Sequence, residues 1–185
     1  MVTKKTKAKE WYSIISPKIF GEKEIGKTMA ADPEHLNGRK IILNIVELVE
    51  NCDKFFMKVS LKVKRIEEKN LFTEFDGTEY MRDYISRMIL RRIRRVDIIE
   101  DLKTKDGVML RVKCLVIISR RVKSSIQKSI RSDVEGLIKK EVEKSTLEEF
   151  LNDIISDDIK HRILSEIRRI YPVRNFEIRK TQLLS

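Results

Sequence analysis

Residues Gly21 to Thr28, written GEKEIGKT, match the phosphate-loop pattern G-x-x-x-x-G-K-[ST]. In such a loop a buried strand leads into a tight glycine turn, which opens directly into a helix. The backbone N–H groups of the turn, the Lys and the Ser or Thr then hold phosphates and magnesium. The first hypothesis for this sequence is therefore a nucleotide-hydrolysing enzyme.

The residues around the motif do not fit that context. Pro17 interrupts the stretch that should be a buried strand, and Pro33 disfavours a long helix after Thr28. Glu22 and Glu24 occupy loop positions where a carboxylate would repel phosphate. We therefore predict a basic surface loop here, and we keep a P-loop NTPase as the less favoured alternative.

The other residues capable of catalysis or metal binding are scattered. Cys52 and Cys114 are the only cysteines, and His35 and His161 have no partners at metal-ligand spacing. No glycine-flanked serine nucleophile is present. The sequence predicts no enzyme activity, no metal, no cofactor and no small-molecule substrate.

The composition favours an anionic partner. The chain has 185 residues, 40 Lys and Arg against 29 Asp and Glu, a net charge of +11 and a pI of about 9.6. Nucleic acid is the commonest partner of so basic a chain, although a protein that is merely basic is the plainer alternative. No apolar run is long enough to span a membrane, and we expect a cytoplasmic protein.

The N-terminal segment 1–39 is predicted to be a basic extension. Its candidate nucleic-acid contacts are Lys4, Lys5, Lys7, Lys9, Trp11, Tyr12, Lys18, Lys23 and Lys27. Two interpretations of the aromatic pair have equal support. Either the rings stack on unpaired bases, or they attach the segment to the protein's own core.

Residues 40–122 alternate as strands, and one helix is expected among them. Phe55, Met57, Val59, Leu61 and Val63 should share one buried face. The Asp-Gly pair after Lys105 predicts a hairpin between 96–104 and 108–118. These features predict an α+β fold built on an antiparallel β-barrel or strongly curved sheet flanked by helices.

The helix expected over 80–97 carries a basic face without any acid between its arginines. Arginine suits forked contacts with phosphate oxygens, so this face is predicted to bind a polyanion. The residues concerned are Arg87, Arg91, Arg92, Arg94 and Arg95.

A second basic cluster opens the helical region 123–170. Its members are Arg120, Arg121, Lys123, Lys128 and Arg131. The capping box Thr146–Glu149 predicts a short helix, and the acid-rich stretch 141–161 is expected to face solvent or a basic protein. Residues 171–185 alternate like a returning strand that exposes Arg174, Arg179 and Lys180.

Four long segments resemble one protein family. They are WYSIISPKIFGEKEIGKT, DYISRMILRRIRRVD, TKDGVMLRVKCLVIISRRVKSSIQKSIR and IYPVRNFEIRKTQLL. Together they are similar to the S3Ae family of archaeal and eukaryotic small-subunit ribosomal proteins, in its shorter archaeal form.

The resemblance implies a structural component of the ribosome that catalyses no reaction. It implies a helix-flanked barrel on the platform of the small subunit, near the 3′ end of the rRNA and the mRNA exit side. The expected partners are small-subunit rRNA, neighbouring ribosomal proteins and mRNA near its exit. Trp11, Tyr12, Pro17, Lys18 and Phe20 would lie along rRNA, and both arginine clusters would meet phosphates. A free DNA- or RNA-binding protein is the alternative.

Overall fold

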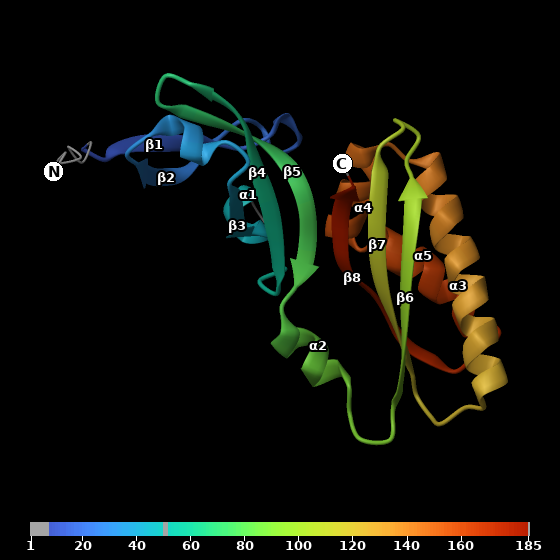
Figure 1. The fold of residues 1–185 in the computed structure, drawn as a ribbon. Helices are drawn as coiled ribbons and strands as arrows, with labels where there is room; N and C mark the ends of the chain where they lie inside the picture. The colour runs from blue at the N-terminus through green and yellow to red at the C-terminus, as the bar shows by residue number, and fades with distance from the viewer. Residues whose placement is uncertain (1–7, 50–51, 185) are drawn as a thin grey trace, which may run out of the picture. The chain divides into compact units, whose positions relative to one another are not determined.

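The computed structural model describes residues 8–49 and 52–184, and the chain divides into two compact units. The units are Met1–Asp76 and Gly77–Ser185, so that β5 begins in one and ends in the other. The predicted α+β class is confirmed (Figure 1). The predicted boundaries at 39/40, 122/123 and 170/171 stay a prediction.

The first unit is mostly strand. Its elements are β1 (Glu10–Ile15), η1 (Lys18–Phe20), β2 (Glu24–Ala30), η2 (Pro33–Leu36), β3 (Lys40–Asn44), α1 (Ile45–Leu48), β4 (Met57–Glu67) and the first part of β5 (Asn70–Tyr80). β1 pairs antiparallel with β2 and parallel with β5, and β4 pairs with both β3 and β5. From Glu10 onward, the predicted extension is therefore built into a sheet.

Alternating side chains explain β4. Met57, Val59, Leu61 and Val63 are buried, as the period-two pattern predicts. Phe55 was expected to share this face, but it lies in the turn before the strand and is 63% exposed.

The second unit is a sheet with helices packed on it. Its elements are the end of β5, α2 (Arg82–Met88), β6 (Arg94–Lys103), β7 (Met109–Ile118), α3 (Ser124–Lys144), α4 (Leu147–Ser156), α5 (Asp158–Arg168) and β8 (Val173–Leu184). The strand order is β5-β8-β7-β6, with antiparallel pairs throughout. α3 packs on β6, and α5 packs on β8 and α3 (Figure 1).

Three elements of the second unit form where local sequence patterns predict them. The β6–β7 hairpin turns at Gly107, where φ is +82° and the N–H donates to the carbonyl of Thr104 at 2.9 Å. The capping box at Thr146 and Glu149 starts α4, and β8 pairs with β7 along its length. These predictions are confirmed.

The predicted barrel is wrong. The eight strands of the described residues form one mixed sheet, which is connected through β5. This sheet does not close into a barrel. Alternating apolar residues specify which face of a strand is buried, but not which strand is its neighbour. The parallel β1–β5 pair, which no hairpin signal announces, made the sheet mixed.

Candidate nucleic-acid interface

Strand register brings two distant arginine clusters to one end of the second unit's sheet. Arg94 pairs with Ile118, and Ile118 pairs with Val173, so the start of β6, the end of β7 and the start of β8 lie in line. The N–H of Ser119 donates to the carbonyl of Pro172 at 3.1 Å and extends this alignment by one residue. We call this region the basic end. It consists of Arg91, Arg92, Arg94, Arg120, Arg121, Lys123 and Arg174.

The α2–β6 connection differs from the prediction. α2 ends at Met88, so Arg91 and Arg92 lie in a turn and Arg94 and Arg95 lie in β6. The expected helix over 80–97 is therefore wrong, because residues 94–103 pair with β7 over ten positions and that pairing requires extended backbone. The arginines do not form one helix face.

The turn that replaces the helix places two arginines at its corner. The N–H of Ile93 donates to the carbonyl of Leu90 at 3.3 Å, and Arg92 has a φ of +72°. A positive φ at the third residue of a four-residue turn is the arrangement of a type II turn. Arg91 and Arg92 are exposed there.

The β7–α3 connection supplies the second cluster. Arg120, Arg121 and Lys123 are exposed between the strand and the helix. Lys128 and Arg131 continue the positive charge along α3, because residues three apart lie on one helix face. A neighbouring face of α3 is buried through Ile130, Val134, Ile138 and Val142.

Two further arginines, which the sequence analysis did not select, belong to this region. Arg168 at the end of α5 donates to the carbonyls of Val173 (3.3 Å) and Arg174 (2.7 Å), which fixes the start of β8. Arg169 is exposed beside it. The signal in the sequence was their position just before Pro172, where a helix must end.

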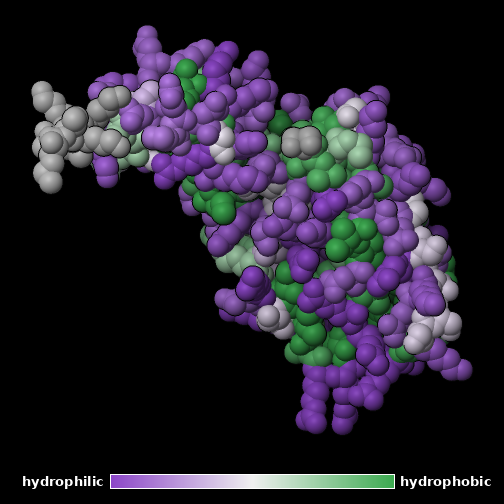
Figure 2. All heavy atoms as spheres, in the orientation of Figure 1, coloured by the Kyte–Doolittle hydropathy of each residue, from purple (hydrophilic) through white to green (hydrophobic). Residues whose placement is uncertain are grey.

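The electrostatics of the basic end are one-sided. Residues 84–96, 117–132 and 167–176 together contain thirteen Arg and Lys and no Asp or Glu. Arg95, a predicted contact that we leave out of the basic end, has its charge offset by Asp97, because its Nη2 lies 2.6 Å from Oδ1 of that residue. Hydrophilic side chains project from this end of the unit, where the α2–β6 and β7–α3 loops turn (Figures 1 and 2).

The N-terminal candidates lie in the other unit. Lys9, Trp11, Lys18, Lys23 and Lys27 are exposed. Tyr12 is 6% exposed and packs in a core cluster with Ile14, Leu36, Val63 and Leu71. Of the two interpretations of the aromatic pair, Tyr12 fits the core and Trp11 the surface. Lys4, Lys5 and Lys7 lie outside the described residues.

The phosphate-loop match has no phosphate-loop structure. Gly26, Lys27 and Thr28 lie within β2, and Gly21 ends a short 3-10 helix in the left-handed region. A P-loop needs a helix to begin at the Lys and the Thr, whereas here both are in a strand paired with β1. The nucleotide-hydrolase hypothesis is therefore rejected.

The last predicted pair, Arg179 and Lys180, lies away from the basic end. Both residues are half-buried along β8, and Lys180 donates to Glu79 at 2.9 Å. This ion pair offsets the charge of Lys180.

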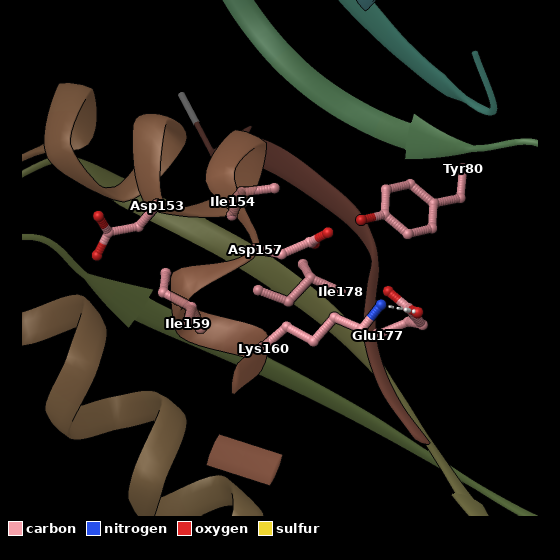
Figure 3. A pocket seen from close by; sticks show the side chains of 8 residues that line it. All are labelled: Tyr80, Asp153, Ile154, Asp157, Ile159, Lys160, Glu177 and Ile178. Carbon is pink, nitrogen blue, oxygen red and sulfur yellow. Dashed lines mark hydrogen bonds and ion pairs between the residues drawn. The ribbon is translucent and has the colours of Figure 1, made fainter. Parts of the chain in front are cut away.

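A buried carboxylate forms a polar cluster between β8, α2 and α5. Glu177 accepts a hydrogen bond from Lys160 Nζ at 2.6 Å, and its side chain is 2% exposed (Figure 3). It also accepts hydrogen bonds from Asn175 Nδ2 (2.9 Å) and Tyr84 Oη (3.2 Å). Burial raises the pKa of Tyr84 far above its ordinary value, and the negative charge of Glu177 adds to this effect. The phenol therefore stays protonated and donates to Glu177. The cluster connects α2, α5 and β8, and Lys160 offsets the charge of Glu177.

The described residues contain neither a metal-binding group nor a membrane-spanning helix. Among residues 8–49 and 52–184, no group of three or more His, Cys, Asp and Glu is arranged to hold a metal ion. No helix in that part of the chain is long and apolar enough to cross a bilayer.

Comparisons with known proteins show which family the chain resembles. The model of the Ribosomal S3Ae family matches residues 1–185. The chain is 34% identical over 188 residues to small ribosomal subunit protein eS1 of Methanopyrus kandleri, which covers 100% of this chain and 89% of the relative. It is 36% identical to the eS1 protein of Methanothermobacter thermautotrophicus over 96% of this chain and 91% of that one. It is 35% identical to the eS1 protein of Sulfolobus acidocaldarius, over 97% of this chain and 92% of that one.

Proposed function

Because this chain belongs to the Ribosomal S3Ae family, we propose that it is a structural component of the small ribosomal subunit whose basic end binds rRNA phosphates. Membership in this family identifies a ribosomal protein and not an enzyme. We place its site on the platform in the cytoplasmic ribosome, near the 3′ end of the rRNA and the exit side of mRNA, beside other ribosomal proteins.

The observation that carries the proposal is the alignment of Arg94, Ile118 and Val173 across three strands. This alignment brings cations from three acid-free segments to the basic end of the sheet. Exposed arginines there can contact several phosphates of one RNA helix. Such contacts hold the protein in position without reading sequence.

RNA binding by paired variants tests the role of the basic end. The RNA is a transcript of the 3′ part of small-subunit rRNA, and binding is measured by filter retention over a salt series. Arg120→Ala with Arg121→Ala should weaken binding. The double change should also reduce the slope of log K against log salt by about 2, because each arginine removed leaves one phosphate without its cation.

The matched control removes equal charge from the same sheet. Lys103→Ala with Lys105→Ala changes two exposed lysines beside the β6–β7 turn, at the opposite end of the strands. We expect this control to change the slope little. Equal losses of affinity in the two double variants, or a flat salt response of the unaltered protein, would contradict the proposal.

A further inference from the structure

Trp11 and Met29 form an exposed apolar pair on the first unit, whereas the basic end belongs to the second unit. They are direct partners across the antiparallel β1–β2 pair, and they are 57% and 49% exposed. Their strand neighbours Tyr12 and Ile14 point the other way, into the core cluster. The unit therefore uses one face of β1 for its own packing and leaves an indole on the other.

A lysine lies on the same face as this pair. Ser13 pairs with Lys27, two residues along each strand, and residues two apart on a strand share a face. Trp11 and Lys27 are therefore diagonal neighbours across the β1–β2 pair, at a separation of roughly 7 to 8 Å that long side chains can span. Lys27 is 3.9 Å from Glu24, both side chains are more than half exposed, and so loose an ion pair leaves the ammonium able to bind another anion.

We infer that Trp11, Met29 and Lys27 form a binding site for an unpaired RNA nucleotide. The base stacks on the indole of Trp11, the flexible thioether of Met29 packs against the ring edge, and Lys27 contacts the phosphate. The inference rests on the proposed RNA-binding function and adds a second site, in the other unit, that recognises single-stranded RNA. Charge favours RNA over a protein partner, because Lys9 is also exposed two residues before Trp11.

The chain contains a single tryptophan, so its fluorescence reports on this site directly. The full-length protein is titrated with an oligoadenylate of roughly eight nucleotides, within the span that one such platform covers. Saturable quenching by the single strand, with much weaker quenching by the same sequence in a blunt duplex, is the expected result. Equal quenching by the duplex or by inorganic polyphosphate would overturn stacking.

Variants separate stacking from charge, with a labelled oligoadenylate as the probe for those that lack tryptophan. Trp11→Ala should weaken binding by roughly fivefold to a hundredfold, and Trp11→Phe should retain most of it. Lys27→Ala should raise the oligoadenylate concentration needed for half-maximal quenching severalfold. Lys58 is an exposed lysine on β4, and Lys58→Ala should leave that concentration unchanged. Equal effects of the two lysine variants would overturn the assignment of Lys27.

The two proposals fail in different ways. Absent quenching, together with retained salt-dependent binding of the rRNA transcript, would overturn the Trp11 site alone. Quenching by the oligonucleotide without any role for Arg120 and Arg121 would support the Trp11 site and overturn the basic end. A shift of Trp11 emission caused by RNA-free small-subunit proteins, but not by the oligonucleotide, would assign the face to a protein and overturn the inference.

Discussion

At the scale of single residues, the second unit depends on a close approach of two backbones at Gly77. A Cβ added there would lie 2.2 Å from the carbonyl oxygen of Thr181 and 3.1 Å from its carbonyl carbon. Gly77 pairs with Gln182 where β5 meets β8, and the Thr78 N–H donates to Thr181 Oγ1 at 3.0 Å beside it. Only glycine allows the two strands this separation.

Gly77→Ala should therefore lower the free energy of unfolding by about 3 kcal/mol, since backbone atoms must shift to relieve the clash. The measurement is urea unfolding followed by circular dichroism. Gly136→Ala is the control, because nothing lies within 4 Å of a Cβ on this exposed position of α3. This change should stabilise the protein by up to about 1 kcal/mol through helix propensity. Similar stabilities of the two variants would contradict the account of Gly77.

At the scale of elements, α4 has a charged cap whose contribution depends on pH. Glu149 Oε2 accepts from the backbone N–H of Thr146 at 2.8 Å, and this hydrogen bond holds the pKa of Glu149 below its ordinary value. A carboxyl with a depressed folded-state pKa stabilises the protein fully above its unfolded-state pKa. That stabilisation is lost as the pH falls through the lower folded-state value.

Glu149→Gln should therefore lower the free energy of unfolding at pH 7. At a pH below the folded-state pKa of Glu149 it should change that free energy little, because the wild-type side chain is itself neutral there. Gln can accept the same hydrogen bond, so the comparison isolates the charge. Urea unfolding at both pH values checks it. Glu148→Gln removes a charge from the same helical turn but not from the capping box, and it should show a smaller pH-dependent difference. A difference that grows on acidification would contradict this account.

The element that sequence reasoning misplaced shows why local patterns have limits. Residues 80–97 have apolar side chains at helical spacing, and α2 does form, but only over Arg82–Met88. From Arg94 onward, the gain from ten residue pairs with β7 exceeds any preference for helix. The basic character of the segment was predictable from its sequence. Its geometry as a turn leading into a strand was not.

At the scale of the whole molecule, the net charge of +11 supports the proposal that the protein binds a polyanion. We expect this chain to co-sediment with the free small subunit and with intact ribosomes through a sucrose gradient at high salt. Many phosphate interactions must break together for the protein to leave. Recovery at the top of the gradient would favour the alternative of a free DNA- or RNA-binding protein.

The sequence by itself determined the basic character, the alternation of β4, the Gly107 hairpin, the α4 cap and the family. These properties depend on residue type or on neighbours a few positions away in the chain. Only the tertiary structure decided that β1 pairs in parallel with β5, that the sheet stays open, and that Arg94, Arg120 and Arg174 meet at one end. It also decided that Tyr12 is buried while Trp11 is exposed. These outcomes depend on which strands pair and in which register, and that is set by interactions between residues far apart in sequence.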